Sequence, residues 1–208
     1  MKIAVIGAAG RAGSRIVSEA LNRNHEVTAI VRSAAKITNL AIKVVEKDIM
    51  ALAVENLQGY DVIVNAFGAP KEVRHLHVEA AKHLTTLLKN LDKPRLIIVG
   101  GAGSLLVDDN GTELHSTPNF PEEYKITAAA MSDELAFLRT VKDVNWTFLS
   151  PSAEFEPGER TGRFRVGKEH LLMDKNGRSS ISMEDYAIAL IDEIEKPENI
   201  KQRFTVGY

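Results

Sequence analysis

The chain of 208 residues contains no cysteine, which excludes disulfides, thiolate metal sites and cysteine nucleophiles. It also lacks any apolar run approaching the roughly 20 residues of a membrane-spanning helix. The apolar run near the N-terminus, Ile3 to Ala9, is at the short limit for a secretory signal and is closed by Arg11. We therefore expect a cytoplasmic protein that does not associate with membranes.

A strong net charge of either sign is missing as well. Lys and Arg number 26 and Asp and Glu number 28, a formal net charge of -2, so no overall field attracts nucleic acid. One local basic cluster is neutralised by neighbouring glutamates, and no aromatic RNA-binding motif accompanies it. This cluster comprises Arg160, Arg163, Arg165 and Lys168. We expect no nucleic-acid partner, and the length and 44% hydrophobic composition fit one globular domain.

Short apolar runs rich in β-forming residues alternate with longer amphipathic stretches over the first three quarters of the chain. This alternation predicts βαβ units and an α/β fold with a doubly wound, Rossmann-like parallel sheet. The predicted strands are Lys2–Ile6, Glu26–Val31, Ile42–Val45, Asp61–Asn65, Arg95–Val99 and Trp146–Leu149. The predicted helices are Arg11–Asn22, Glu72–Asn90 and Glu122–Val141.

The alternation stops after Ser150-Pro151, where a stretch rich in Glu, Gly and Arg begins. Beyond it the pattern predicts short strands near Gly162–Val166 and Arg178–Ile181, a helix over Met183–Glu195 capped by Ser182, and a last strand at Arg203–Val206. We expect a single domain, 1–208. Residues 1–150 would form a nucleotide-binding core, and residues 151–208 a small lobe that covers the substrate pocket.

The most informative segment is the turn after the first predicted strand, with glycine at 7, 10 and 13. Gly7 suits a tight turn, Gly10 lets backbone approach a pyrophosphate, and Gly13 lets the following helix pack closely on the strand. The amides at the start of that helix attract an anion. A strand before the glycines and a helix after them is the context that a dinucleotide-binding turn requires.

Arg32 follows the second predicted strand, where an NAD-binding turn of this type carries an acidic residue. An arginine there suits the 2′-phosphate of NADP(H), so NADP(H) is favoured over NAD(H). Arg11 offers a second cation. The alternatives are an ordinary glycine-rich turn and a solvated Arg32 without a specific role.

Three further strand ends meet at the same edge of the predicted sheet, so their turns converge on one crevice. Asp48, after the third strand, can accept a hydrogen bond from an adenine amino group. Small residues in the other turns leave room for a cofactor. The predicted cofactor contacts are Gly7, Ala8, Ala9, Gly10, Arg11, Ala12, Gly13, Arg32, Asp48, Ile49, Asn65, Ala66, Phe67, Gly68, Gly100 and Gly101.

The glycine turn, Arg32, Asp48 and the turns at 65–68 and 100–104 together resemble the atypical short-chain dehydrogenase/reductases, in their NmrA-like and biliverdin/flavin reductase branch. The C-terminal quarter is similar to bacterial proteins of the NADH-flavin reductase type. The similar segments are Trp146–Pro151, Phe155–Gly162, Ile181–Ala187 and Gln202–Tyr208. The resemblance covers essentially the whole chain. It implies an NAD(P)-binding oxidoreductase whose substrate pocket is roofed by the segment after Pro151.

Reductases of the larger superfamily carry a Tyr-x-x-x-Lys pair, in which the tyrosine supplies the proton. Tyr124 is followed directly by Lys125, and Ala128 stands four residues on, so the pair is absent. Its loss argues against ketone reduction, because an alkoxide product needs a positioned acid. A flavin or quinone accepts hydride directly and takes its proton from water. We therefore expect an NAD(P)H-dependent reductase with a small flavin-like or quinone-like acceptor.

The candidate catalytic residues are Ser104 and Tyr124, as proton donors or hydrogen-bonding groups, and a purely structural role stays open for each. The candidate substrate contacts are Pro151, Phe155 and Phe164, in the segment expected to cover the pocket.

His75, Glu79 and His83 repeat at helical spacing, while His77 faces elsewhere. Without another ligand at a suitable spacing, we interpret them as a solvated helix face and expect no metal site. The competing function is an NmrA-like regulator that senses NADP(H) and signals to a protein partner without robust turnover. A monomer and a homodimer both fit the sequence.

Overall fold

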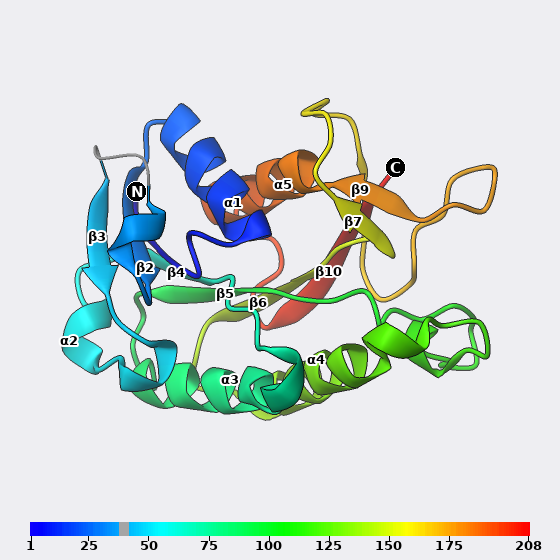
Figure 1. Ribbon diagram of the computed structural model, residues 1–208, viewed down its shortest axis with the longest axis horizontal. Helices are drawn as coiled ribbons and strands as arrows, with labels where there is room; N and C mark the ends of the chain where they lie inside the picture. Colours follow the sequence, from blue (N-terminus) through cyan, green and yellow to red (C-terminus); the bar gives the residue numbers. More distant parts are fainter. Residues whose placement is uncertain (38–41) are drawn as a thin grey trace.

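The structure is a computed structural model that describes residues 1–37 and 42–208 (Figure 1). Its main sheet has eight strands in the order β3-β2-β1-β4-β5-β6-β10-β8. The strands pair in parallel except β8, which is antiparallel to β10. They are β1 (Lys2–Ile6), β2 (Glu26–Val31), β3 (Lys43–Glu46), β4 (Val62–Asn65), β5 (Arg95–Val99), β6 (Trp146–Ser150), β8 (Arg165–Gly167) and β10 (Gln202–Gly207). A second, two-stranded sheet pairs β7 (Glu154–Glu156) with β9 (Ser180–Ser182). The predicted doubly wound α/β fold is confirmed.

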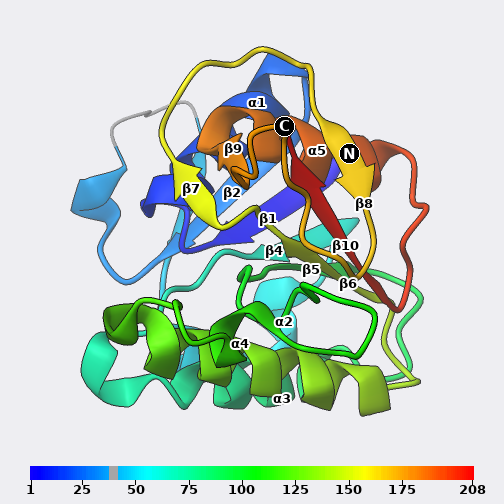
Figure 2. The ribbon, with the colours of Figure 1, turned by 90° about the vertical axis from the view of Figure 1, so that its right-hand side faces the viewer.

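Helices cover both faces of the main sheet, which Figure 2 shows from one edge. The helices α1 and α5 pack together on one face, and α3 and α4 pack together on the other. The bounds are α1 (Arg11–Asn22), α2 (Val54–Leu57), α3 (Leu76–Leu87), α4 (Glu122–Thr140) and α5 (Met183–Glu195), with short 3-10 helices at Ala34–Lys36, Ile49–Ala51, Lys71–Val73 and Leu114–Ser116. In the described parts of the chain, no helix is both long and apolar enough to cross a membrane.

Alternating side chains of β1 show how two cores arise from one sheet. Ile3 and Val5 face α1 and α5, while Ala4 and Ile6 face α3 and α4. All four are buried, because successive residues of a strand point to opposite faces and both faces are covered. This double burial explains why the strand is apolar after its first residue, the exposed Lys2.

The segment after residue 150 contributes to the main sheet as well as to the small one. β10 lies between β6 and β8, and α5 covers the same face as α1. The buried Tyr186 of α5 donates a hydrogen bond from its hydroxyl to the Leu149 carbonyl of β6 (2.8 Å). The predicted cap of α5 is confirmed, since the Ser182 hydroxyl accepts from the Asp185 amide at 3.0 Å.

Several predicted bounds were wrong in detail. The helix predicted at Glu72–Asn90 is shorter, because its first residues form a 3-10 turn and α3 itself covers only Leu76–Leu87. The strand predicted near Gly162–Val166 is displaced to Arg165–Gly167 by its pairing with β10. The two short elements β7 and α2 were not predicted, since three or four residues carry too little periodicity.

Candidate functional site

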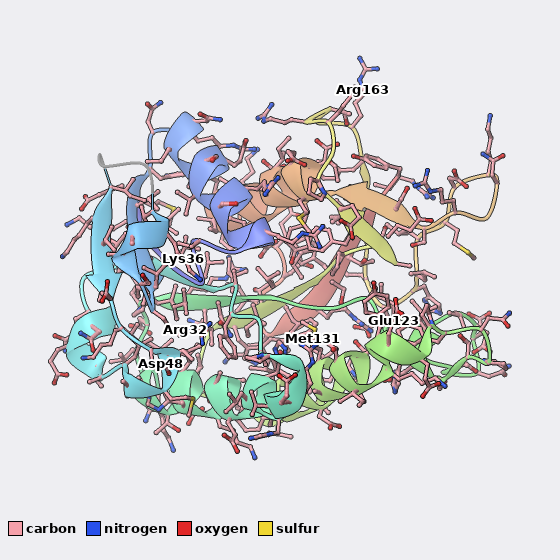
Figure 3. The ribbon with its side chains drawn as sticks, viewed as in Figure 1. Arg32, Lys36, Asp48, Glu123, Met131 and Arg163 are labelled. Atoms are coloured by element: carbon pink, nitrogen blue, oxygen red, sulfur yellow. The ribbon has the colours of Figure 1, made fainter. Side chains whose placement is uncertain are left out.

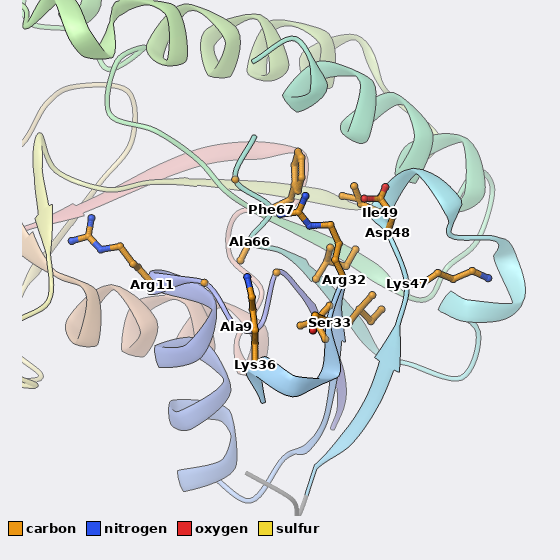
Figure 4. Close-up of a pocket in the computed structure, with 16 residues that line it drawn as sticks. Ala9, Arg11, Arg32, Ser33, Lys36, Lys47, Asp48, Ile49, Ala66 and Phe67 are labelled. Atoms are coloured by element: carbon orange, nitrogen blue, oxygen red, sulfur yellow. The ribbon is translucent and has the colours of Figure 1, made fainter. Parts of the chain in front are cut away.

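A cavity of about 370 Å³ lies at the carboxyl ends of β1, β2, β3 and β4 (Figure 4). In a parallel sheet this edge is where ligands bind. Of the predicted cofactor contacts, ten line the cavity: Gly7, Ala9, Gly10, Arg11, Arg32, Asp48, Ile49, Ala66, Phe67 and Gly68. The cavity is also lined by residues that the sequence did not indicate: Ile6, Ile30, Val31, Ser33, Lys36 and Lys47.

The glycine turn is built so tightly that side chains would not fit. Gly7 has a φ of +75° and its amide donates to the Ile30 carbonyl at 3.0 Å. A Cβ on Gly7 would stand 2.5 Å from the Ala66 carbonyl oxygen, and one on Gly13 only 2.2 Å from the Gly7 oxygen. The turn, the strand β4 and the first turn of α1 therefore touch backbone to backbone, as the spacing predicts.

The start of α1 fits an anionic group. Its N-cap is Gly10, with no side-chain cap hydrogen bond, and its first turn holds no acidic residue. The terminal amides of the helix and the positive end of its dipole are thus left for a ligand. The glycine turn forms a cradle of closely packed backbone. This glycine cradle and the uncapped helix together fit the pyrophosphate of a dinucleotide.

The end of β2 supplies two cations to the same cavity. Figure 4 shows Arg32 and Lys36 both directed into the hollow, Lys36 from the 3-10 turn Ala34–Lys36. Ser33 lies between them on the lining. The carboxylate of Glu46, on the neighbouring strand, is turned away to accept from the Ala34 amide at 2.6 Å. Lys36 was missed because only the fold of the turn brings it back to the cavity.

Two other cations on the lining point away from the hollow (Figure 4). Arg11 forms an ion pair with Glu156 of β7. Lys47 reaches towards α2, where its Nζ donates to Asn56 Oδ1 at 2.9 Å. Arg11 is therefore occupied by a carboxylate in this structure, although its backbone belongs to the phosphate turn.

Asp48 and Asn65 both use their side chains to shape turns. Asp48 Oδ1 accepts from the Met50 amide at 2.9 Å, and the residue remains exposed on the cavity rim. Asn65 is buried, and its Oδ1 accepts from the Phe67 amide at 3.2 Å. Asn65 thus supports the wall formed by Ala66, Phe67 and Gly68 without lining the cavity itself.

The glycines after β5 serve close packing. A Cβ on Gly100 would stand 2.1 Å from the Phe148 ring, and one on Gly101 2.9 Å from Met131 Sδ of α4. In Figure 3, Met131 points from α4 towards the sheet. Gly100 and Gly101 are not among the cavity-lining residues, nor are Ala8, Ala12 and Gly13. Four of the five strand ends therefore line the cavity, and a cofactor contact at Gly100 and Gly101 stays a prediction.

The two candidate catalytic residues lie outside the cavity. Ser104 is 4% exposed, and its Oγ accepts from Arg203 Nη1 at 3.1 Å. Tyr124 is 57% exposed on the first turn of α4. A catalytic role for either stays a prediction.

The candidate substrate contacts pack mainly within the protein. Pro151 is buried, and the Phe155 ring lies 4.7 Å from that of Tyr186, centroid to centroid. Phe164 lines a second cavity of about 490 Å³, beside α5 and β10. Their contact with a substrate stays a prediction.

The segment that connects β7 to β8 is fastened across α1 and α5. Arg160 donates twice to the buried Glu19 of α1, at 2.8 and 2.9 Å. Asp185 of α5 accepts from the amides of Thr161 and Gly162 at 2.8 and 2.9 Å. Hydrogen bonds from the guanidinium groups of Arg160 and Arg23 lower the pKa of Glu19 despite its burial. The middle of the segment is therefore held to both helices by charge-assisted bonds.

The histidines of α3 do not gather ligands. His75 and Glu79 are exposed, while His83 Nε2 lies 2.9 Å from the Leu52 carbonyl oxygen. In the ranges that the structure describes, no three His, Cys, Asp or Glu side chains are placed to hold a metal ion.

Comparison with known proteins gives consistent results. A family model described as NAD(P)H-binding matches residues 7–197. The "uncharacterized protein YwnB" of Bacillus subtilis is 48% identical over 99% of this chain and 98% of its own. A crystal structure from Streptococcus pneumoniae, called a "putative NADH-flavin reductase", is 44% identical, with a TM-score of 0.94 over 100% of this chain and 99% of its own. A protein of Bacteroides thetaiotaomicron called a "putative epimerase" is 40% identical, with a TM-score of 0.87 over 100% and 96%.

Proposed function

This chain belongs to the NAD(P)H-binding family, and we propose that it is an NADPH-preferring reductase that transfers hydride to a flavin or a quinone-like acceptor. The observation that carries the proposal is the cavity at the strand ends, with its glycine cradle on one side and two cations on the other. The name of the pneumococcal relative supports the choice of acceptor class.

The preference for NADPH rests on the end of β2. Arg32 and Lys36 are directed into the cavity, and Ser33 adds a hydroxyl beside them. A 2′-phosphate there would meet two positive charges, and charge-assisted bonds of this kind are about twice as strong as neutral ones. The ribose 2′-hydroxyl of NADH would leave both cations without an anion.

Different residues of the site would hold different parts of the cofactor. The backbone at Gly7 and Gly10 and the start of α1 would hold the pyrophosphate, and Arg32 with Lys36 the 2′-phosphate. Ala66, Phe67 and Gly68 form part of the cavity wall. The bound cofactor supplies a hydride. Besides the hydride, a flavin or quinone needs one proton, which it can take from water, so the missing Tyr-x-x-x-Lys pair does not prevent the reaction.

Steady-state oxidation of NADPH with FMN, riboflavin or a small quinone tests the activity. We expect acceptor-dependent turnover above the rate without enzyme. Tight NADPH binding without turnover on any of these acceptors would contradict the reductase and favour the NADP(H)-sensing regulator.

The cofactor preference is tested with Arg32→Ala and Lys36→Ala. A charged hydrogen bond contributes about 1.5 to 3 kcal/mol, so each substitution should weaken NADPH binding about tenfold or more and leave NADH binding unchanged. Lys43→Ala is the matched control, because Lys43 is an exposed cation at the opposite end of β3. Equal losses for NADPH and NADH would refute the assignment of these cations to the 2′-phosphate.

A further inference from the structure

Behind the wall of the cavity, α3 and α4 bring two buried titratable groups together. His77 lies on the first turn of α3 and is 4% exposed, and Glu134 lies on α4 and is 1% exposed. His77 Nδ1 is 3.9 Å from Glu134 Oε2. Neither oxygen of Glu134 has a hydrogen-bond partner among the described residues. A buried polar group without a partner costs stability, so its presence calls for a reason.

His77 is in direct contact with the turn that forms the cavity wall. Its Nε2 accepts a hydrogen bond from the buried Ala69 amide at 3.4 Å. Its ring lies against Phe67, with the centroids 5.9 Å apart. Phe67 lines the cavity, and Ala69 follows the last lining residue, Gly68. His77 therefore connects α3 to the wall of the cofactor cavity.

This contact fixes the chemistry of the imidazole. A ring nitrogen that accepts a hydrogen bond carries no proton, so the single proton of neutral His77 is on Nδ1, the atom that faces Glu134. Burial, with a smaller effect of the Arg74 charge, lowers the pKa of His77 to about 4. Burial raises the pKa of Glu134 to about 8. Both side chains are uncharged at neutral pH.

Other charged groups on the surrounding elements are turned elsewhere. Arg74, which precedes α3, donates to the Ala69 carbonyl and so holds the same turn from the other side. Lys82 of α3 extends over the Phe137 ring, with its Nζ 5.8 Å from the centroid. Asp133, next to Glu134 on α4, is exposed. Among the described side chains, His77 is the titratable group that faces Glu134.

We propose that His77 is a positioning residue for cofactor binding, in which Nε2 holds the Ala69 amide while the protonated Nδ1 faces the carboxyl of Glu134. His77 would thereby set the shape of the wall at Ala66–Gly68. This inference rests on the proposed binding of NADPH in the cavity, and it is independent of the hydride acceptor.

Two substitutions of His77 separate its roles. In His77→Gln the amide oxygen stands near the place of Nε2 and can still accept from Ala69, whereas in His77→Asn it stands near Nδ1 and cannot. A buried amide left without an acceptor destabilises the turn that contains it. We expect His77→Gln to bind NADPH within about twofold of wild type and His77→Asn about tenfold more weakly. Fluorescence titration with NADPH gives the affinities, and thermal unfolding checks that both variants fold.

A second measurement does not depend on the stability of a variant. Imidazole nitrogen shifts of ¹⁵N-histidine-labelled protein show which nitrogen carries the proton, and the His77→Gln spectrum identifies the His77 signals. We expect the proton on Nδ1 in wild type and in Glu134→Gln, whose amide oxygen can still face it. In Glu134→Leu the Ala69 amide still donates to Nε2, so we expect the proton to remain on Nδ1 there as well.

The outcomes distinguish the two proposals. A His77 proton on Nε2, or equal NADPH affinities of His77→Gln and His77→Asn, would overturn the positioning role alone. No saturable NADPH binding by the wild-type protein would overturn the proposed cofactor site and this inference with it.

Discussion

Replacing Glu134 by Gln should make the protein more stable, and the gain should grow with pH. In the folded protein Glu134 keeps its proton up to about pH 8, because burial raises its pKa from 4.5. The unfolded chain releases that proton near pH 4.5. Between these values the folded state holds one proton more than the unfolded state. The free energy of unfolding therefore falls as the pH rises, and the stability that is fully present below pH 4.5 is lost by about pH 8.

The size of the effect follows from the pKa difference. Each pH unit in this window changes the free energy of unfolding by about 1.4 kcal/mol, so the window from 4.5 to about 8 corresponds to about 5 kcal/mol. His77 acts in the opposite direction, since its lowered pKa of about 4 means that stability is lost as the pH falls below 6.5. In wild type the two effects offset each other between about pH 4.5 and 6.5, and the decline due to Glu134 stands alone above pH 6.5.

Urea unfolding of both proteins at several pH values measures the difference directly, because the other titrating groups contribute equally and cancel. The stability of Glu134→Gln relative to wild type should rise by about 4 kcal/mol between pH 5 and pH 8 and then stay constant. Glu123→Gln is the control, since Glu123 is an exposed side chain of the same helix (Figure 3), and its difference should not vary with pH. A difference between Glu134→Gln and wild type that is constant over this range would show that Glu134 is already ionised and refute the reasoning.

Two further predictions concern the glycine turn and its neighbour. Glu156→Gln removes the carboxylate that pairs with Arg11 and should strengthen NADPH binding by up to about fivefold, as expected for an exposed ion pair of about 0.2 to 1 kcal/mol. Glu154 is on the same strand as Glu156 but pairs with Arg178. NADPH titration of Glu154→Gln should therefore give the wild-type affinity. An equal gain in affinity there would contradict a competition between Glu156 and NADPH for Arg11. Gly13→Ala places a methyl group 2.2 Å from the Gly7 oxygen and should lower the free energy of unfolding in urea by about 1 to 3 kcal/mol. Gly68→Ala, with open space around its Cβ, should cost much less, and equal losses would show that the contact at Gly13 is easily relaxed.

The parallel sheet could be predicted because most of its strands are short apolar runs, buried on both faces of the sheet, that can be recognised from neighbouring residues alone. β1, β2 and β5 have the predicted bounds, since in each a mostly apolar run follows one charged residue and is ended by a turn. β7 could not be predicted, because its pairing partner, β9, lies far along the chain at residues 180–182. The three residues of β7 show no pattern by themselves. Likewise, nothing local indicates that β10 enters the sheet between β6 and β8.

The candidate site divides in the same way. The roles of Gly7 and Gly13 depend on backbone contacts within the turn and at β4, so their spacing was sufficient to predict them. Lys36 reaches the cavity through a 3-10 turn that the sequence did not indicate. The sequence correctly predicts that His77 faces away from the other histidines of its helix. That it lies opposite Glu134 depends on how α3 and α4 pack, which the sequence does not indicate. Sequence patterns specify faces, and tertiary packing specifies which faces meet.

The long separation of α1 and α5 along the chain has a consequence for synthesis. α1 is made well before α5, and α5 covers the buried face of α1. Until α5 is made, the surface of α1 that packs against it has no covering helix. A nascent chain with such exposed apolar surface depends on chaperones or on rapid completion. We therefore expect a ribosome-stalled chain ending before Met183 to be degraded readily by protease, and the full-length chain to resist.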